Sequence, residues 1–428
     1  MKKVLIITYY WPPAGGPGVQ RWLKFVKYLP EYGIEPIVYV PKNPTYPLID
    51  EELQKEVSYN TTILKNNIIE PYGWASVFSK KNTKKISSGI IPDKKKQSAL
   101  QKLMLWVRGN LFIPDARVLW VRPSVSYLSN YLQGSGIDTI ITTGPPHSLH
   151  LIGMELQKRF GVKWIADFRD PWTTIGYHKE LRLSESSQKM HIKMEGDVLN
   201  TADSIIVTSP TTKAEFEQLT DKPVTVITNG YDVELIAKEP LDEKFTLAHI
   251  GSFLSERNPK ILWESLSELV NEEDAEFKDY FELKLIGAVS QEVLTSIEQY
   301  GLTDYVNNMG YVSHSEAVKQ QRKSQVLLLV EIDSPDTRCI IPGKLFEYMA
   351  SERPIVGIGP ERADFADIIR TTNSGVFVDY TEKEKLKDTF KSYFEQFMGE
   401  GLKAHAIGLQ QYSRRNLTKQ LADLLKQS

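Results

Sequence analysis

Residues 4–29 read VLIITYYWPPAGGPGVQRWLKFVKYL, and they contain the first repeating unit of the fold. Val4 to Thr8 is a short apolar run of β-forming residues, which predicts a buried strand. A loop rich in proline and glycine follows, from Pro12 to Gly18. The next segment carries apolar residues at helical spacing, namely Trp22, Phe25, Val26 and Leu29. A strand, a tight loop and an amphipathic helix in this order are typical of a parallel α/β sheet.

The same alternation of strand and helix continues through both halves of the chain. The first half contains further predicted strands at Pro36–Val40, Thr139–Thr142, Trp164–Phe168, Ser204–Thr208 and Val224–Ile227. After the polar stretch Lys238 to Lys244, strands recur at Thr246–Ile250, Glu282–Ile286, Tyr305–Met309, Gln325–Val330, Ile355–Ile358 and Gly375–Val378. We therefore predict an α/β protein with two Rossmann-like domains, 1–238 and 239–428, each with a doubly wound parallel sheet. The last helix, Leu417 to Leu425, is expected to dock on either domain.

The composition of the 428 residues is that of a soluble globular protein, with 41% hydrophobic and 25% charged residues. The net charge of −2 gives no support to a nucleic-acid partner. Cys339 is the single cysteine, so no intramolecular disulfide can form, and a cytoplasmic location is expected. The first apolar run ends at Trp11-Pro12-Pro13 without a cleavage pattern, so we interpret it as a strand and not as a signal peptide.

Residues 74–120 interrupt the alternation and are predicted to be a helical insertion in the first domain. Three lysines, Lys94 to Lys96, precede an apolar series that includes Leu103, Trp106 and Leu111. A basic cluster beside an amphipathic, tryptophan-containing segment is typical of proteins that bind an anionic membrane surface. The alternative is a surface helix packed on its own domain.

The loop that contains Gly16 and Gly18 is expected to face a phosphate or a sugar, because glycine allows close approach to a ligand. It does not match a dinucleotide fingerprint, since Arg21 occupies the third glycine position and Lys42 stands where an acidic residue would hold a ribose. A tight turn without a ligand remains the alternative.

Two polar clusters follow strands of the first domain. Asp167 to Trp172 includes Arg169 and Asp170, at the carboxyl end of a strand, where parallel sheets bind ligands. Trp172 is a candidate to stack on a sugar, and an internal Arg–Asp salt bridge is the alternative for the charged pair. His147 and His150 lie three residues apart, but no third metal ligand is evident, so we expect hydrogen bonding at a helix start and no metal site. His147 is a further candidate for the acceptor side.

The second domain carries the candidates for phosphate binding. Gly251 and Ser252 end a strand, and Arg257 precedes a helix, where its planar donors would suit phosphate oxygens. Gly343, Lys344 and Glu347 belong to the segment PGKLFEYMA, in which a lysine supplies positive charge and a glutamate one turn later could accept both ribose hydroxyls. A simple intrahelical Lys–Glu pair is the alternative.

These motifs together resemble the bacterial family-four glycosyltransferases, over nearly the whole chain. The resemblance rests on the glycine-rich first loop, the Asn229-Gly230-Tyr231-Asp232 segment, Gly251-Ser252 with Arg257-Asn258-Pro259, and KLFEYMA. It implies a GT-B fold, transfer with retention of anomeric configuration, and no metal or cofactor, with both domains closing on a nucleotide-diphosphate sugar. By this resemblance, Glu347 would bind the ribose and Arg257 and Lys344 the diphosphate.

Two positions depart from the family pattern. Many members carry a second glutamate eight residues before the one at position 347, and this chain has Cys339 there. Many also have a histidine where this chain has Arg169-Asp170, and relatives that act on bacterial surface polysaccharides are similar to it in this respect. The expected acceptor is therefore a saccharide or a lipid-linked saccharide at the inner face of the membrane.

The expected mechanism follows from the charge that develops on the leaving diphosphate, which Arg257 and Lys344 would neutralise. The chain contains no D-x-D sequence, the usual means of holding a divalent ion beside a sugar nucleotide. Asp170 is the candidate for orienting the acceptor. Two alternatives remain open: a nucleotide-sugar isomerase or hydrolase of the same fold, and a non-catalytic scaffold at a membrane.

Overall fold

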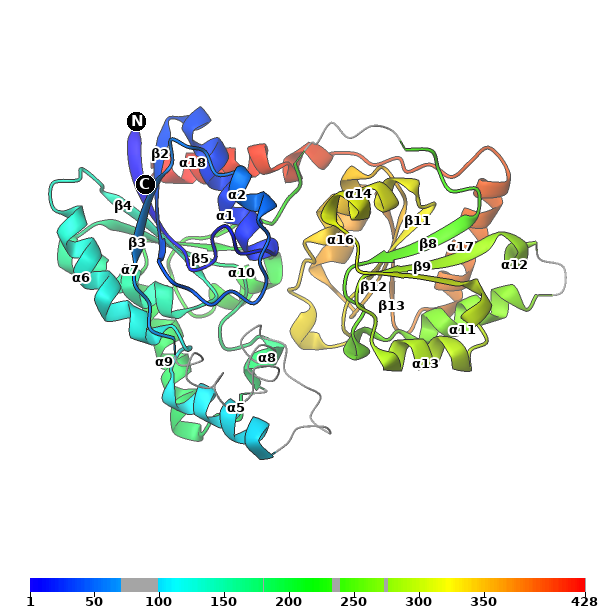
Figure 1. Ribbon diagram of the computed structural model, residues 1–428, viewed down its shortest axis with the longest axis horizontal. Helices are drawn as coiled ribbons and strands as arrows, with labels where there is room; N and C mark the ends of the chain where they lie inside the picture. Colours follow the sequence, from blue (N-terminus) through cyan, green and yellow to red (C-terminus); the bar gives the residue numbers. More distant parts are fainter. Residues whose placement is uncertain (71–98, 180, 233–238, 273–275, 428) are drawn as a thin grey trace. The chain divides into compact units, whose positions relative to one another are not determined.

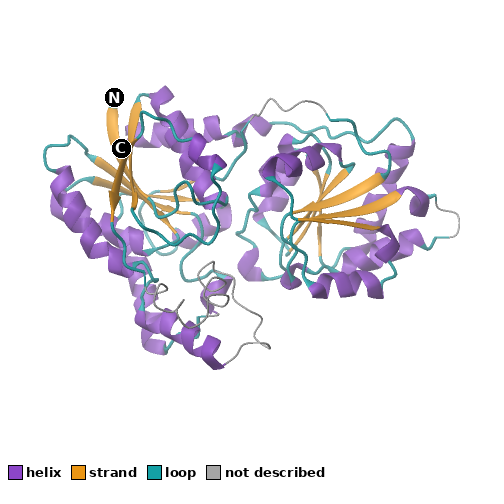
Figure 2. Cartoon of the chain, in the orientation of Figure 1, coloured by secondary structure: helices purple, strands orange, loops and turns teal. Residues whose placement is uncertain are grey.

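The chain divides into two compact units, shown in Figure 1 by sequence colour and in Figure 2 by secondary structure. Unit 1 comprises Met1–Asn229 and Arg414–Ser428, and unit 2 comprises Gly230–Ser413. The computed structural model describes residues 1–70, 99–179, 181–232, 239–272 and 276–427. Each unit has its own parallel sheet with helices on both faces.

Unit 1 contains a seven-stranded parallel sheet in the order β3-β2-β1-β4-β5-β6-β7. Its strands are β1 (Lys2–Ile7), β2 (Ile34–Pro41), β3 (Thr62–Asn66), β4 (Thr139–Gly144), β5 (Lys163–Phe168), β6 (Ser204–Val207) and β7 (Val224–Val226). Side chains of β1 alternate between the two cores: Leu5 and Ile7 join one, and Val4 and Ile6 join the other. This alternation is the two-residue period of an extended chain covered on both faces.

Most helices of unit 1 pack on one or the other face of this sheet. They are α1 (Pro17–Tyr28), α2 (Glu52–Lys55), α5 (Ala99–Leu111), α6 (Val121–Leu132), α7 (Ser148–Phe160), α8 (Gly176–Lys179), α9 (Glu185–Thr201), α10 (Pro210–Phe216) and α18 (Arg414–Gln427). The apolar stripe of α18, with Leu417, Leu421 and Leu425, shares a core with Trp22 of α1. The C-terminal helix is therefore part of unit 1.

Unit 2 contains a six-stranded parallel sheet in the order β10-β9-β8-β11-β12-β13. Its strands are β8 (Phe245–Ile250), β9 (Phe281–Ile286), β10 (Val306–Gly310), β11 (Val326–Val330), β12 (Ile355–Gly359) and β13 (Gly375–Asp379). Its helices are α11 (Lys260–Val270), α12 (Phe277–Tyr280), α13 (Gln291–Gln299), α14 (His314–Lys323), α15 (Lys344–Ala350), α16 (Asp364–Thr371) and α17 (Lys383–Met398). Residues of α11, α13 and α17 form one core, and residues of α15 and α16 form the other.

The predicted fold class, two α/β domains with parallel sheets, is confirmed, and each predicted strand is present within one or two residues of its expected bounds. The sequence analysis missed β3. This edge strand has no fully buried residue, and its sequence TILKN lacks the continuous apolar run that marks a central strand. Edge strands carry fewer apolar residues because one side of them is not covered by another strand.

The two connections between the units run side by side where they enter unit 2. The backbone N–H of Tyr231 donates to the carbonyl of Tyr412 at 3.2 Å. Tyr231 belongs to the same core as Phe346 of α15, and the Phe346 ring lies 5.4 Å from the Tyr412 ring. Both connections are therefore packed against the helix that carries Lys344 and Glu347.

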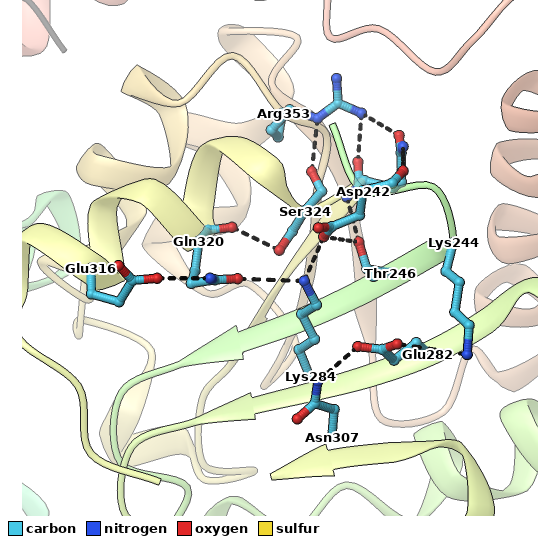
Figure 3. A network of polar contacts seen from close by, with 11 residues as sticks. Asp242, Lys244, Thr246, Glu282, Lys284, Asn307, Glu316, Gln320, Ser324 and Arg353 are labelled. Carbon is cyan, nitrogen blue, oxygen red and sulfur yellow. Dashed lines mark hydrogen bonds and ion pairs between the residues drawn. The ribbon is translucent and has the colours of Figure 1, made fainter. Parts of the chain in front are cut away.

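A polar network holds the segment that precedes β8 (Figure 3). Asp242 accepts hydrogen bonds from Lys284 Nζ at 2.6 Å and from Thr246 Oγ1 at 2.9 Å. Its backbone carbonyl accepts from Gln325 Nε2 at 2.7 Å, and Arg353 Nη2 donates to Gln325 Oε1 at 2.9 Å. Pairing of each buried charge offsets the cost of removing it from water. The network thus ties the segment before β8 to β9 and to residues just before β11 and β12.

Among the described helices, none combines the length and apolar character that a membrane span requires. The predicted basic cluster Lys94–Lys96 lies outside the described residues.

Candidate functional site

The candidate donor site of unit 2 lies where β8 and β9 end. Gly251 follows β8 with a φ of 116°, a left-handed conformation that favours glycine. Gly287 follows β9, and a Cβ atom there would lie 2.5 Å from the carbonyl oxygen of Gly251. The two strand ends therefore pack backbone against backbone. Ser252, the next residue along, is exposed.

Lys344 extends from the first turn of α15 toward this strand end. Its Nζ lies 3.3 Å from Nε2 of His249 and 3.4 Å from the backbone oxygen of Ile250. A Cβ atom at Gly251 would lie 3.6 Å from the same Nζ. Burial, with the charge of Arg257 as a second cause, lowers the pKa of Lys344 to about 7. The Lys344 amine is therefore only partly protonated at neutral pH. An anion beside it would favour the charged ammonium form.

His249 and Tyr348 make contacts that hold the end of β8 in place. His249 is fully buried and its ring stacks on Phe253, with ring centroids 4.1 Å apart. Burial lowers the pKa of His249 well below its usual value, and the nearby Lys344 lowers it further. The imidazole is therefore neutral. Tyr348 Oη accepts a hydrogen bond from the backbone N–H of Ile250 at 2.9 Å, which connects α15 to the strand.

Arg257 lies at the end of a short 3₁₀ segment, Ser255–Arg257, and α11 begins only at Lys260. Its guanidinium pairs with Glu331, the residue directly after β11. Nε donates to Glu331 Oε1 at 3.1 Å, and Nη2 donates to Oε2 at 3.3 Å. The Glu331 carboxylate is almost completely buried, whereas the Arg257 side chain is 27% exposed. The pairing thus fixes the edge of the guanidinium formed by Nε and Nη2, and the side chain as a whole is not fully buried.

Glu347 lies one turn after Lys344 on α15 and is half-buried. Its Oε2 accepts one hydrogen bond, from Gln321 Nε2 at 3.3 Å, and no described ion pair joins it to Lys344. The intrahelical Lys–Glu pair considered from the sequence is therefore not formed among the described residues. Gly343 precedes α15 with helical dihedral angles, so its conformation does not require a glycine.

Four charged groups thus surround the end of the central strands of unit 2. Arg257, Glu331 and Glu347 each act electrostatically on Lys344, and Arg257 and Glu331 also contact each other directly. Glu331 is the functional candidate that the sequence analysis missed. The available signal was an acidic residue directly after the continuous apolar run Val326–Val330, a position at the ligand-binding edge of a parallel sheet.

In unit 1, Gly18 and Arg169 form a close contact between two predicted site segments. A Cβ atom at Gly18 would lie 1.9 Å from Arg169 Nη1, so a larger residue cannot occupy position 18 without displacing the guanidinium. Arg169 also donates to the carbonyl oxygens of Gly144 and Pro145. Arg169 therefore ties the loop after β4 to the end of β5 and to the start of α1. Gly16, the residue before α1, has a φ of 102°.

Asp167 is a buried carboxylate that holds three elements of unit 1 together. It accepts hydrogen bonds from Arg21 Nη2 at 2.9 Å, Trp22 Nε1 at 2.9 Å and Thr143 Oγ1 at 2.7 Å. Arg21 also donates to the carbonyl of Thr228 at 2.7 Å, and its side chain is almost fully buried. Arg21 therefore has a structural role, because it connects α1 to β5 and to the segment after β7 that contains Thr228.

Asp170 is half-buried and forms no hydrogen bond or ion pair with the described residues. The internal salt bridge between Arg169 and Asp170 is thus not formed. Burial raises the pKa of Asp170, and the charge of Arg169 opposes this effect. A carboxylate with unused acceptors at the carboxyl end of β5 remains a candidate for binding a hydroxyl group.

His147 and Trp172 pack on each other inside unit 1. Their rings are parallel within 4°, with centroids 4.8 Å apart, and Trp172 is 1% exposed. Trp172 Nε1 donates to His191 Nδ1 at 3.1 Å. The Trp172 ring is therefore part of the core. One face stacks on His147 and the ring is almost fully buried, so no face is left for a sugar. Both ring nitrogens of His147 are buried without a hydrogen-bond partner in the described structure.

No group of three or more His, Cys, Asp or Glu residues within the described ranges has a geometry that could hold a metal ion. Cys339, which occupies the position of the earlier family glutamate, is buried in the loop before α15. Its Sγ lies 3.8 Å from the carbonyl oxygen of Asp336.

Part of the chain matches a known protein family. Residues 90–235, about a third of the chain, match the family model described as Glycosyltransferase Family 4. No curated protein matches the chain. The sucrose-phosphate synthase of Thermosynechococcus elongatus has a TM-score of 0.60 at 14% identity, with 100% of this chain and 99% of that chain covered.

Two further solved structures are similar over their full length. Anabaena HepE, solved in complex with UDP-glucose, has a TM-score of 0.61 at 13% identity, with 100% of both chains covered. The lipopolysaccharide outer core galactosyltransferase WaaB has a TM-score of 0.59 at 14% identity, again with 100% of both chains covered. At these identities the likeness shows the fold: two parallel-sheet α/β domains of the GT-B class.

The chain carries a glycosyltransferase family 4 region within a GT-B fold, and the resemblance drawn from its motifs is confirmed. The family match also supports the glycosyltransferase class of enzyme.

Proposed function

We propose that the chain is a retaining glycosyltransferase that moves a sugar from a nucleotide-diphosphate donor to a saccharide or lipid-linked acceptor in cell-surface polysaccharide synthesis. The observation that carries this proposal is the cluster of Arg257, Lys344 and Glu347 at one edge of the unit 2 sheet. Two cations and a carboxylate with unused acceptors match a ligand that has a diphosphate and a ribose.

The cations of this cluster supply what the reaction requires. Cleavage of a glycosyl-diphosphate bond places negative charge on the leaving diphosphate, and fixed positive charge there lowers the barrier. Lys344, with a pKa near 7 before the donor binds, takes up a proton as the diphosphate arrives. Arg257 stays charged throughout and would offer to the phosphate oxygens the edge that Glu331 does not use. The two side chains therefore replace a divalent metal ion in this proposal.

Glu347 is assigned to the ribose. Its carboxylate accepts a single hydrogen bond from the described residues, at Oε2, so acceptor positions remain for two ribose hydroxyls. Gly251 leaves space for a ligand beside Lys344, because glycine has no side chain. Its φ of 116° disfavours almost every other residue type at this position. HepE, of the same fold, was solved with UDP-glucose, which supports a sugar nucleotide as the ligand class.

The acceptor is assigned to unit 1. Asp170, with unused acceptors and a raised pKa, would bind and orient the acceptor hydroxyl at the end of β5. An oxygen of the donor phosphate would take the hydroxyl proton as the hydroxyl attacks from the side of the leaving group. Arg169 would act indirectly, because its guanidinium is engaged with the carbonyls of Gly144 and Pro145 and holds the surrounding loops.

A panel of UDP-, GDP-, ADP- and dTDP-sugars tests the proposal through thermal stabilisation, because a ligand that binds the native state raises its melting temperature. The bound donor is then incubated with saccharide acceptors, with and without EDTA, and the products are analysed. We expect transfer that depends on the acceptor, retains the anomeric configuration and survives chelation. Product formed without an acceptor would favour the isomerase or hydrolase, and no binding by any donor would favour the scaffold.

We also propose that unit 1 contacts the inner face of the membrane through α5. This helix buries Leu105 and Gly109 against the unit but leaves Leu103, Trp106 and Leu111 at 56%, 44% and 64% exposed. An exposed apolar stripe with a tryptophan is typical of helices that lie in a membrane interface. WaaB, of the same fold, is a lipopolysaccharide transferase, which supports an acceptor at a membrane.

Vesicle flotation tests the membrane proposal with anionic and neutral liposomes at low and high salt. Trp106→Ser together with Leu103→Ser should reduce binding to anionic vesicles several-fold, because the two side chains are the apolar contact. Tyr311→Ser serves as the matched control, since Tyr311 is an exposed aromatic residue of unit 2. Wild-type protein that does not float with anionic vesicles would contradict the membrane role but leave the transferase proposal intact.

A further inference from the structure

Glu331 is a buried carboxylate at the end of β11. It follows the last residue of β11, and its side chain is 1% exposed. The backbone N–H of Ile332 donates to Oε1 at 2.9 Å, and the Tyr380 hydroxyl donates to the backbone oxygen of Glu331 at 2.8 Å. These bonds hold the residue rigidly on the central part of the sheet.

The remaining capacity of the carboxylate is used by Arg257. The guanidinium meets it with the edge formed by Nε and Nη2, at 3.1 Å and 3.3 Å, and Nη2 also lies 3.0 Å from Oε1. No described group accepts a hydrogen bond from Nη1, the third nitrogen of the guanidinium. Because the group is planar and rigid, fixing one edge also fixes the direction in which the N–H groups of Nη1 point.

We propose that Glu331 is a positioning residue, which orients Arg257 so that its free edge meets the diphosphate of the donor. This inference rests on the proposed function of the site and identifies a residue that neither the motifs nor the comparisons assign. Arg257 is carried by a single 3₁₀ turn, Ser255–Arg257, which has no buried residue of its own. The orientation of the guanidinium therefore depends on Glu331, and prior orientation lowers the entropy cost of binding.

Glu331 also adjusts the charge that Lys344 experiences. The groups around Lys344 Nζ are His249 on β8, Arg257, Glu331 and, on its own helix, Glu347. Arg257 lowers the pKa of Lys344, whereas Glu331 and Glu347 raise it. Loss of the Glu331 charge would leave Arg257 without its counter-ion and make protonation of Lys344 harder. A change at Glu331 should therefore move the pH dependence of donor binding toward lower pH, an effect that a purely structural role would not produce.

The test is isothermal titration of the nucleotide-sugar selected by the panel into wild type, Glu331→Gln and Glu256→Gln. Glu256 is an exposed carboxylate on the same 3₁₀ turn and serves as the matched control. We expect Glu331→Gln to weaken binding about tenfold, the scale for a charged hydrogen bond, and Glu256→Gln to leave it within twofold. The pH at which binding declines should also fall in Glu331→Gln.

A double-mutant cycle separates positioning from structure. If Glu331 positions Arg257, then adding Glu331→Gln to Arg257→Met should produce no further loss of affinity, measured well below pH 7 so that Lys344 is charged in every variant. The double variant also removes both buried charges together, so it keeps the test available if Arg257→Met alone does not fold. An equal loss in both backgrounds, or a Glu331→Gln variant with wild-type affinity, would overturn the inference while the donor site stands. Wild-type protein that binds no nucleotide would instead refute the proposed function.

Discussion

In unit 1 the charged residues at the end of β5 are mostly used by the protein itself, whereas in unit 2 Arg257, beyond β8, and Glu347, on α15, keep unused donors and acceptors. Asp167 accepts three hydrogen bonds inside unit 1, and Arg169 donates to two carbonyls. In unit 2, Arg257 is held by one edge and Glu347 by one hydrogen bond. A dense group of charges after a strand therefore does not by itself indicate a ligand site.

The difference follows from what surrounds each carboxylate. Asp167 is enclosed by α1, β4 and β5, so its charge can be stabilised only by fixed protein donors. Glu347 lies on a half-buried face of α15, where water or a ligand can satisfy it. Satisfied charges hold a fold together, and partly satisfied charges remain available for binding.

The largest effect that we expect is a loss in the free energy of unfolding when Asp167 is replaced. Asp167→Ala leaves Arg21 buried without its counter-ion, and loss of one partner of a buried pair costs about 3–5 kcal/mol. We expect urea denaturation to show this loss for unit 1, with donor binding to unit 2 unchanged in the folded protein. Asp221→Asn, at an exposed position of the same unit, should change the free energy of unfolding by less than about 0.5 kcal/mol. Equal stability of the two variants would contradict the structural role of Asp167.

A smaller effect is expected for Glu347, and on a different property. Glu347→Gln should weaken donor binding by about 1–3 kcal/mol, the scale for loss of a charged acceptor, and should leave the melting temperature unchanged. Titration calorimetry with the preferred donor measures the first quantity, and thermal unfolding measures the second. Glu352→Gln, at an exposed position just beyond α15, is the control. A lower melting temperature with unchanged donor affinity would show that Glu347 has a structural role and does not bind the donor.

The smallest effect is the pH dependence of donor binding. Donor binding favours the ammonium form of Lys344, whose pKa before binding is about 7. Affinity should therefore be constant well below pH 7 and decline as pH rises through 7, by at most about tenfold (~1.4 kcal/mol) per pH unit. A nucleotide-sugar is the proper ligand, because its diphosphate diester does not titrate in this range. Lys344→Arg, which keeps its charge, should give a flat profile, and a flat wild-type profile would contradict the role of Lys344.

Much of the fold could be predicted from local sequence, because its central strands are continuous apolar runs between polar loops. Residues one or two positions after such a run, such as Gly251 and Asp170, can also be placed at the ligand-binding edge of a parallel sheet. The edge strand Thr62–Asn66 was missed because it is only partly covered and lacks that signal. Trp172 was expected to face a sugar, but its ring stacks on His147 in the core, a contact between segments 25 residues apart in the chain.

The sequence by itself determined the alternation of strands and helices, the two parallel sheets, and the identity of the charged residues that follow their strands. These properties depend on the period of apolar residues and on neighbours in the chain. The tertiary structure alone decided which of those charges are used within the protein. Asp167 meets Arg21 across 146 positions, and Arg257 meets Glu331 across 74. Such pairs form only when the sheet brings distant strand ends together, because the free energy of a buried charge depends on partners in space and not in sequence.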